Sequence, residues 1–233
     1  MIVAEGVYQI SGVAYGTNSN TFLIKTQKGW VLIDSGFGEF QLEVMKRNLE
    51  ALGIGFRDIC QVLLTHAHFD HAGNASFFQK LGAEIKIGKG DKRAVEQGGP
   101  STLESLFHKK FSRCGIVIGL KDGETLDCED VMIQVIGTPG HTKGAVAYLA
   151  KTPTAHILFT GDLFVIPGVT PQEEVNVELG WNGDPLYDRE ADKKTFGKLR
   201  GTKVDIIAPG HGTVYYGDSL EIFEKCYQLS RDS

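Results

Sequence analysis

The sequence predicts an α+β fold in which two β-sheets pack face to face and helices lie outside them. Short strand-like runs recur in both halves of the chain, and segments with helical spacing lie between them. The 233 residues are 42% apolar and 23% charged, which is enough apolar material for a sizeable core. Because no Pro/Gly/Ser-rich linker separates two halves, we expect one domain over residues 1–233.

The first half of the chain contains predicted strands and helices in alternation. Residues 21–26 and 30–34 are strand-like runs, and Gln27-Lys28-Gly29 between them is a hairpin signal. Residues 39–52 carry apolar side chains at helical spacing and stop before Gly53, which predicts a helix. The other elements expected here are a buried strand over 59–64, a helix over 74–81 and a strand over 85–87.

The second half repeats this style, with short strands that stop at glycine-containing loops. Strand-like runs cover residues 131–136, 145–149, 157–160 and 205–208. Two further segments, 189–200 and 218–229, are predicted to be helices. Strands and helices in both halves favour two packed sheets with helices on the outside.

Four of the predicted strands end at a loop that carries a candidate metal ligand. The densest loop follows the strand over 59–64, where three histidines and one aspartate lie within six residues. Imidazole and carboxylate are the usual protein ligands of zinc and its neighbours. Each imidazole removed from water needs a hydrogen-bond or metal partner, so packing alone explains this density poorly. The candidates are His66, His68, Asp70 and His71 on this loop, His141 after 131–136, Asp162 after 157–160 and His211 after 205–208.

Seven candidate ligands suit two metal ions better than one, because a catalytic zinc has about three protein ligands and an open position for water. Two ions about 3.5–4 Å apart can share a carboxylate and provide hydroxide at neutral pH, and this chemistry is hydrolysis. A purely structural zinc site fits poorly, because such sites are closed and often Cys-rich, and none of the four cysteines lies near these loops. We expect two divalent ions, with zinc preferred and iron or manganese as alternatives.

At these residues the chain resembles the metallo-β-lactamase superfamily. The His-x-His-x-Asp-His motif begins at His66, and the later ligands lie in Thr-Pro-Gly-His-Thr, Phe-Thr-Gly-Asp and Pro-Gly-His-Gly. The resemblance implies a four-layer αββα sandwich with the metals at one edge between the two sheets. It also implies an orienting role for Asp34, although a turn aspartate at a strand end fits the sequence equally well. The ligand set that it implies is His66, His68 and His141 for the first metal, Asp70, His71 and His211 for the second, and Asp162 as the bridge.

The activity that the resemblance implies is hydrolysis by a hydroxide bound between two metals, with Asp70 as a catalytic residue. Asp162 argues against the true β-lactamases, which generally have Cys or Ser at that position. The ligand set is similar to that of glyoxalase II, a thioesterase. Acyl-homoserine lactonases have Tyr three residues after the bridging Asp, where this chain has Val165. A thioester or another small acyl ester is therefore the expected substrate.

Three alternatives stay open at this point. The first is a mononuclear iron dioxygenase acting on glutathione persulfide, which would use His66, His141 and Asp162. The second is a lactonase or phosphodiesterase of the same superfamily. The third is a binding protein without catalysis, although metal binding explains seven costly polar groups in a pocket better.

Two stretches between the ligand-bearing strands, residues 97–114 and 163–187, are the least strand-like parts of the chain and are expected to shape the pocket. Aromatic residues in them are candidates for substrate contact, with packing over the core as the alternative. A lysine two residues after His141 is a candidate partner for an anionic substrate group, with a solvated surface position as the alternative. The candidates for substrate contact are Phe164, Trp181, Tyr187 and Lys143.

Composition and charge narrow the choice of partners. The formal net charge is −5, which argues against nucleic acid or an anionic membrane, because a phosphate-binding footprint needs clustered Lys and Arg. The N-terminus lacks a secretory signal pattern, and no window approaches the roughly 18 apolar residues that span a bilayer. The four cysteines are scattered and are expected to be free thiols. We therefore expect a cytoplasmic protein with a small-molecule substrate.

Overall fold

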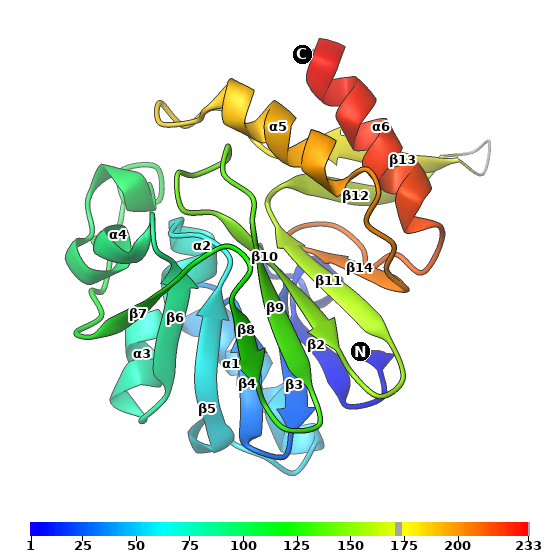
Figure 1. Cartoon of the computed structure of the whole chain (residues 1–233). Coiled ribbons are helices and arrows are strands. Elements are labelled where there is room, and N and C mark those ends of the chain that lie inside the picture. Colours follow the sequence, from blue (N-terminus) through cyan, green and yellow to red (C-terminus); the bar gives the residue numbers. More distant parts are fainter. Residues whose placement is uncertain (171–173, 233) are drawn as a thin grey trace.

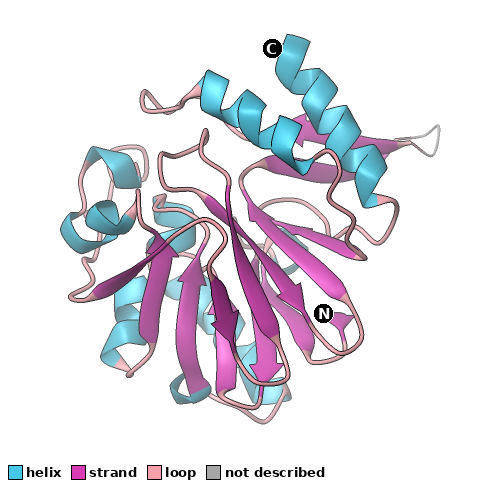
Figure 2. Cartoon of the chain, in the orientation of Figure 1, coloured by secondary structure: helices cyan, strands magenta, loops and turns pink. Residues whose placement is uncertain are grey.

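A computed structural model describes residues 1–170 and 174–232, and it contains two large β-sheets packed face to face with helices outside both (Figure 1; Figure 2). This confirms the predicted four-layer αββα sandwich. The first sheet has seven strands in the order β1 to β7, and β4 to β7 are parallel. These strands are β1 (Ile2–Ala4), β2 (Val7–Ser11), β3 (Thr21–Thr26), β4 (Gly29–Ile33), β5 (Ile59–Leu64), β6 (Glu84–Gly88) and β7 (Val117–Leu120).

The second sheet has five strands in the order β14-β11-β10-β9-β8, and a separate two-stranded sheet pairs β12 with β13. All neighbours in the five-stranded sheet are antiparallel except β11 and β14, which run parallel. These strands are β8 (Thr125–Asp127), β9 (Met132–Gly137), β10 (Val146–Lys151), β11 (His156–Gly161), β12 (Phe164–Val169), β13 (Val175–Leu179) and β14 (Ile206–Pro209).

Alternating side chains along the central strands build the core between the sheets and the core beneath the helices. In β3, Phe22 and Ile24 belong to the core between the two sheets, whereas Leu23 packs with the residues under the outer helices. In β5, Leu63 lies between the sheets, whereas Val62 and Leu64 face the helices. Successive side chains of a strand point to opposite faces, so each central strand contributes to both cores. Each such fully buried side chain stabilises the fold by about 1.5–3 kcal/mol.

Helices form the two outer layers. The outer face of the five-stranded sheet is covered by two helices, which lie side by side in the upper part of Figure 1. On the seven-stranded sheet, a short 3₁₀ turn over Phe56–Asp58 leads directly into β5. The helices are α1 (Gly38–Ala51), α3 (Ala75–Lys80) and α4 (Lys92–Gln97) on the seven-stranded sheet, α5 (Arg189–Leu199) and α6 (Ser219–Asp232) on the five-stranded sheet, and the short α2 (Phe69–Ala72) after β5.

Most predicted elements are confirmed. The strands expected over 21–26 and 59–64 match β3 and β5 residue for residue, and β3 and β4 form the predicted hairpin with Thr26 opposite Gly29. The four predicted helices correspond to α1, α3, α5 and α6 to within a few residues. The sequence does not predict β7, β8 and α4, which have only 4, 3 and 6 residues and therefore a weak periodic signal.

One expectation is wrong. The stretch 163–187, expected to be among the least strand-like parts, contains β12 and β13, while its residues 171–173 lie outside the described residues. Pro167 and Gly168 interrupt the alternation of β12, and both residue types ordinarily indicate a break. Antiparallel pairing with β13, which places Phe164 opposite Leu179, overrides that local signal.

The loops that follow β5, β9, β11 and β14 meet at one edge of the sandwich, so the four sequence segments with candidate ligands lie together.

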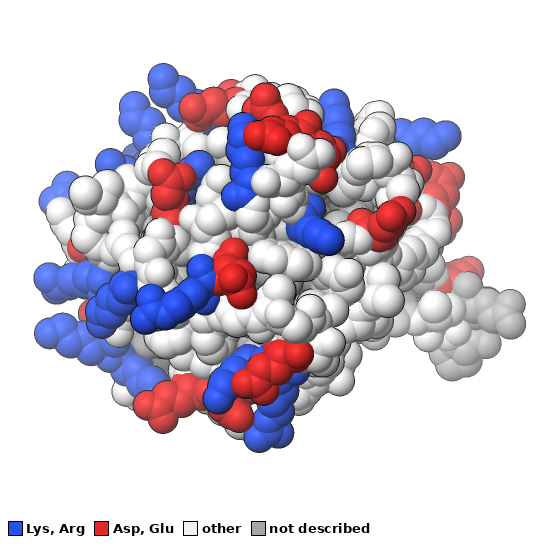
Figure 3. All heavy atoms as spheres, turned by 90° about the horizontal axis from the view of Figure 1, so that it is seen from below, with Lys and Arg blue, Asp and Glu red and all other residues white. Residues whose placement is uncertain are grey.

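The face seen from below in Figure 3 carries Lys and Arg side chains interspersed with Asp and Glu. No helix in residues 1–170 and 174–232 is both long enough and apolar enough to cross a membrane.

Candidate metal centre

The seven candidate ligands form two adjacent groups of donor atoms. Within each group the donor atoms lie within 4.8 Å of one another, which is close enough to hold a metal ion. The first group consists of three buried imidazoles, whereas the second combines two imidazoles with two carboxylates. The first group is His66, His68 and His141, and the second is Asp70, His71, Asp162 and His211.

The Asp162 carboxylate lies between the two groups. Its Oδ1 is 3.0 Å from Nε2 of His71, and its Oδ2 is 3.3 Å from Nε2 of His211. On the other side, Oδ2 is 3.6 Å from Nε2 of His141 and 3.9 Å from Nε2 of His66. A single carboxylate therefore reaches both sets of imidazole nitrogens.

Two glycines let the loops approach this closely. Gly161 has a φ of 54°, and a Cβ atom there would lie 2.6 Å from Oγ1 of Thr65. A Cβ atom at Gly210 would lie 2.4 Å from Oδ1 of Asp162 and 2.7 Å from the His71 ring. Any larger residue at either position would push the ligand loops apart, because the contacted atoms belong to the site itself.

Every candidate histidine has a hydrogen-bond partner on one ring nitrogen, which leaves the other nitrogen directed at the cluster. Such partners set the tautomer and the orientation of metal-binding imidazoles. His68 is bonded through Nε2, and the other four through Nδ1. The pairs are His66 with Oγ1 of Thr65 (3.0 Å), His68 with Oδ2 of Asp184 (3.0 Å), His71 with Oδ2 of Asp34 (2.8 Å), His141 with the carbonyl oxygen of Trp181 (3.0 Å) and His211 with the carbonyl oxygen of Asn18 (3.2 Å).

Asp34 combines the two roles that its sequence position suggested. It follows β4 with a left-handed backbone, φ 57°, as a turn residue does. Its carboxylate also accepts hydrogen bonds from the backbone N–H of Thr65 at 2.7 Å, from the Thr65 hydroxyl and from Nδ1 of His71. Asp34 thereby positions His71 directly and His66 through Thr65.

The residues present fit a metal. Nε2 of His66 and Nε2 of His141 are buried and have no hydrogen-bond partner in the described part of the chain. A buried polar atom without a partner costs about 1–3 kcal/mol, so two of them facing the same point require an explanation. A cation among these nitrogens would satisfy both. Imidazole nitrogens and carboxylate oxygens are the ligands that zinc takes in catalytic sites.

The two groups differ in charge. Burial lowers the pKa of His141 to about 4 and holds the pKa of His66 well below its ordinary value, so both imidazoles are neutral at pH 7. Burial also opposes protonation of His211, but the nearby carboxylates, Asp162 foremost, outweigh it and raise the pKa of His211 to about 10. The second group thus holds positive charge between two carboxylates, which is the position a metal cation would take.

Several residues that orient the site are missed by sequence reasoning. Asp184 is buried and bonds His68 across 116 residues of chain. Asp91 is also buried, and its carboxylate accepts hydrogen bonds from the N–H of Ala67, the N–H of Gly144 and the hydroxyl of Thr142, which ties the two loops of the first group together. Both aspartates follow glycine in the sequence and look like ordinary turn residues.

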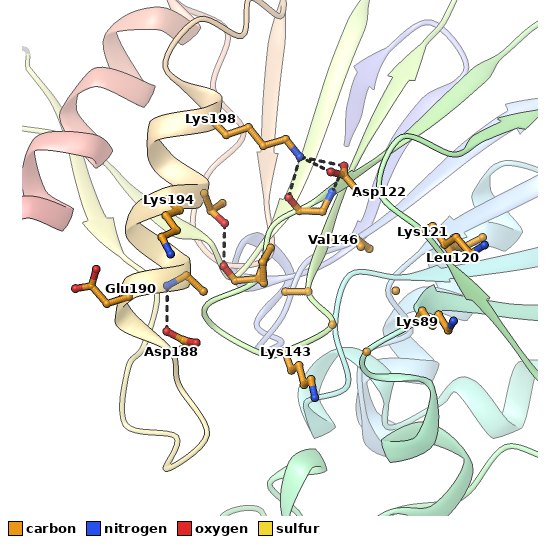
Figure 4. Close-up of a pocket in the computed structure, with 18 residues that line it drawn as sticks. Lys89, Leu120, Lys121, Asp122, Lys143, Val146, Asp188, Glu190, Lys194 and Lys198 are labelled. Carbon is orange, nitrogen blue, oxygen red and sulfur yellow. Dashed lines mark hydrogen bonds and ion pairs between the residues drawn. The ribbon is translucent and has the colours of Figure 1, made fainter.

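Of the residues expected to contact substrate, Trp181 lines the cavity beside the donor atoms. The expectation that Phe164 contacts substrate is wrong, because Phe164 is fully buried beneath α6 and packs against Phe223. The Tyr187 hydroxyl donates to Asp192 on α5, and Tyr187 does not line this cavity. Lys143 is exposed and borders two other cavities, including the one of about 620 Å³ drawn in Figure 4.

Comparison with known proteins agrees with this geometry. The family described as the metallo-beta-lactamase superfamily matches residues 14–211. A probable metallo-hydrolase of Methanocaldococcus jannaschii is 29% identical over 214 residues, covering 88% of this chain and 92% of that protein. An atrochrysone carboxyl ACP thioesterase of Aspergillus fumigatus is 28% identical over 196 residues, covering 84% of this chain but 51% of that protein.

A solved structure shows the same fold. A metallo-beta-lactamase family protein from Thermus thermophilus superimposes with a TM-score of 0.76 at 20% identity, covering 99% of this chain and 81% of that one. The segment matched by the family model includes all seven candidate ligands and spans well over half of the sequence. This chain therefore belongs to the metallo-beta-lactamase superfamily.

Proposed function

We propose that this metallo-hydrolase cleaves thioesters or other small acyl esters and that it holds two divalent metal ions, with zinc preferred. The observation that carries the proposal is the place of Asp162 between the two donor groups, 3.0 Å from Nε2 of His71 and 3.6 Å from Nε2 of His141. A carboxylate shared by two ions is typical of two-metal hydrolytic sites. An isolated one-metal site has no need of the second group.

In this proposal each donor group would hold one ion. His66, His68 and His141 would hold the first ion, and Asp70, His71 and His211 would hold the second, with Asp162 within reach of both groups. When bound, the ions supply a water that is ionised near neutral pH and stabilise negative charge on the substrate oxygen. Zinc is preferred because the donors are imidazoles and carboxylates, which also accept iron or manganese.

The protein's own contribution is to hold ligands and nucleophile in one geometry. Asp70 lines the cavity, and its Oδ2 is 3.2 Å from Nε2 of His211 and accepts a hydrogen bond from Nδ2 of Asn18 at 3.2 Å. Burial opposes ionisation of Asp70, but His71 and His211 outweigh it and lower the pKa of the carboxyl. Asp70 is therefore a carboxylate at neutral pH and can orient the attacking water by accepting its hydrogen bond.

The relatives support hydrolysis as the reaction, and the name of one of them supports a thioester as the substrate. The Methanocaldococcus jannaschii relative is called a metallo-hydrolase, and the Aspergillus fumigatus relative is called a thioesterase. This chain spans about half of that thioesterase, so its thioester activity is carried over only as part of the proposal. The four free cysteines support the cytoplasmic location that we also propose.

The proposal is tested by metal analysis and activity on the same sample. Protein reconstituted with zinc should contain two equivalents of metal per chain, and it should release free thiol from a simple acyl thioester without consuming oxygen. Asp162→Ala is the matched variant, and it should lose metal and thiol release together. Exposed Asp122, which pairs with Lys198 on the surface, provides a control as Asp122→Asn.

Each other outcome points to a different function. One iron per chain with oxygen uptake on a persulfide substrate would replace the hydrolase with a dioxygenase. Hydrolysis of lactones or phosphodiesters but not thioesters would keep the two-metal hydrolase and overturn the substrate class. A sample with two metals that is inactive on every substrate class would favour a binding protein.

A further inference from the structure

A cavity of about 370 Å³ opens beside the donor atoms, and two kinds of residue line it. The polar lining consists of ligand side chains and Asn18. The rest of the lining is apolar apart from Gly180, and among the described residues no lysine or arginine lines the cavity. The apolar lining residues, which we call the acyl wall, are Leu103, Leu106, Phe107, Val165 and Trp181.

The acyl wall is attached to the metal-binding motif. Phe107 stacks on Phe69 with ring centroids 5.3 Å apart and an interplanar angle of 19°. Phe69 is the residue between His68 and Asp70, so Phe107 packs directly against the motif that carries these ligands. Phe107 also meets the Phe37 ring edge-on at 5.1 Å.

The segment that carries Leu103, Leu106 and Phe107 has an unusual backbone at Leu103. Leu103 follows a 3₁₀ turn over Pro100–Thr102 and has a φ of 58°, a left-handed conformation that residues with side chains seldom adopt. The Leu103 N–H donates to the Pro100 carbonyl at 2.9 Å, and the Leu103 carbonyl accepts from the Leu106 N–H at 2.9 Å. Strained backbone of this kind clusters at ligand-binding sites.

The rim of the cavity exposes large apolar side chains. Leu106 is 56% exposed and Trp181 is 47% exposed. Each square ångström of apolar surface that a ligand covers contributes about 25 cal/mol to the free energy of binding. Contact of these two side chains with an apolar group would therefore favour binding. The backbone at Trp181 is fixed beside the donors, because its carbonyl oxygen accepts a hydrogen bond from Nδ1 of His141.

Cationic side chains lie around a different cavity. The space of about 620 Å³ in Figure 4 is bordered by Lys89, Lys121, Lys143, Lys194 and Lys198, and Lys198 is paired with Asp122. None of these lysines lines the cavity with the acyl wall. Among the described residues, no lysine or arginine therefore meets the part of a substrate that points from the donors toward the acyl wall.

We propose that the acyl wall binds an uncharged apolar acyl chain and thereby determines which esters are cleaved. This inference rests on the proposed function, since it assigns the acyl half of the same substrate. Small-molecule pockets have volumes of about 300–1,000 Å³, so a cavity near the lower limit accommodates the acyl end while the alcohol or thiol half lies at the mouth. Medium-length aliphatic and arylacetyl groups fit this description, and dicarboxylic acyl groups do not.

The first test measures binding without chemistry. Acetate, hexanoate, phenylacetate and succinate are titrated into the zinc-loaded protein by calorimetry, because all four share a carboxylate that can face the metals. Hexanoate and phenylacetate should bind at least about 10-fold more tightly than acetate, as expected for several methylene groups against an apolar surface. Succinate should bind more weakly than hexanoate. Equal affinities for all four acids would contradict the proposal that the acyl wall binds an apolar acyl chain.

Variants of the wall sharpen the comparison. Leu106→Ala and Trp181→Ala should each lower the hexanoate-to-acetate affinity ratio, and Leu106→Lys should shift the preference toward succinate. Leu220 on α6 is a matched exposed leucine outside this cavity, and Leu220→Ala should keep the wild-type ratio. A ratio that is unchanged in all three wall variants would also contradict the proposal.

The second test separates this inference from the proposed function. Acetyl, hexanoyl, phenylacetyl and succinyl thioesters of one simple thiol are compared by kcat/KM, and the order should follow the affinities of the acids. Preferential binding of hexanoate without hydrolysis of any thioester would support acyl-chain binding by the wall and contradict the proposed thioesterase activity. Thioester hydrolysis with no preference for the apolar acyl groups would support the thioesterase activity and contradict acyl-chain binding by the wall.

Discussion

Nε2 of His68 lies 3.0 Å from a carboxylate oxygen of Asp184, and both side chains are buried. The contact leaves Nδ1 of His68 as the atom available to the first donor group, together with Nε2 of His66 and Nε2 of His141. The same loop contributes the Trp181 carbonyl that orients His141. One segment of the chain, from Trp181 to Asp184, therefore orients two of the three imidazoles of the first group and also borders the cavity.

Removing the Asp184 carboxylate should weaken metal binding at the first group. Loss of a partner that orients a ligand typically costs about 10–100-fold in metal affinity, and we expect about this loss in Asp184→Ala. Competition with a chromogenic chelator measures it. Asp184→Asn, which keeps an oxygen for His68, should lose less, and surface Asp122→Asn should bind as the wild type does. Wild-type affinity in Asp184→Ala would show that the contact only supports the fold.

Removing the carboxylate between the two groups should affect both metals. Asp162→Ala should contain less than one equivalent of the second ion and lose at least about 100-fold in turnover, because a shared ligand and its negative charge disappear together. Elemental analysis and turnover of the same preparation check this. A variant with two metals and unchanged turnover would exclude a bridging role for Asp162.

Neutralising Asp70 should separate catalysis from folding. Asp70→Asn preserves size and can still accept the hydrogen bond from Asn18, so its melting temperature should stay within about 5 °C of wild type, a shift worth roughly 1–2 kcal/mol. Turnover should fall by at least about 100-fold, because the variant lacks the negative charge of the Asp70 carboxylate that would orient the attacking water. Turnover equal to wild type would mean that Asp70 has no part in the reaction.

Chelation of the metals should lower the melting temperature. A ligand present at about 100 times its Kd stabilises the folded state by about 2.7 kcal/mol, and about 1 kcal/mol corresponds to roughly 2–4 °C in a domain of this size. Each ion should therefore account for roughly 5–10 °C of the transition temperature, and removal of both ions should lower the transition by roughly 10–20 °C in calorimetry, which added zinc should reverse. The same chelator should shift Asp162→Ala much less. An identical shift in this variant would place the stabilising ion elsewhere.

Asp192, which is not one of the candidate ligands, should make the stability of the folded protein depend on pH. Burial raises the pKa of its carboxyl from 3.8 to about 6, and Oδ1 has no hydrogen-bond partner among the described residues. The neutral Asp192 carboxyl favours the folded state, and this stabilisation is fully present below pH 3.8. It is lost as the pH rises to about 6 and above, because the ionised carboxylate is more stable in the unfolded chain. The loss is about 2–3 kcal/mol at about 1.36 kcal/mol per pKa unit.

The uncharged variant Asp192→Asn provides the comparison, because other carboxyl groups titrate in the same range. The free energy of unfolding of Asp192→Asn minus that of wild type should rise by about 2–3 kcal/mol between about pH 4 and pH 7. Urea denaturation at a series of pH values measures this difference. A difference that does not change with pH would show that Asp192 ionises normally in the folded protein.

Local sequence patterns were sufficient to identify the candidate ligands and the central strands. His66, His68, Asp70 and His71 are close in space because they are close in the chain, and strands such as β3 and β5 have strong local patterns. Glycine-rich turns at strand ends located His141, Asp162 and His211, because strand ends at one edge of a sheet aim their loops at a common point.

The residues that orient these candidate ligands and the side chains that line the cavity follow from long-range packing and cannot be read from local patterns. Asp184 and Asn18 reach their histidines across 116 and 193 residues, and no local pattern distinguishes them from ordinary loop residues. Phe164 and Trp181 are both large aromatic residues in one stretch, yet one is buried in a core and the other borders the cavity. Burial and hydrogen bonding depend on which distant segments pack together, whereas sequence patterns report only on neighbours along the chain.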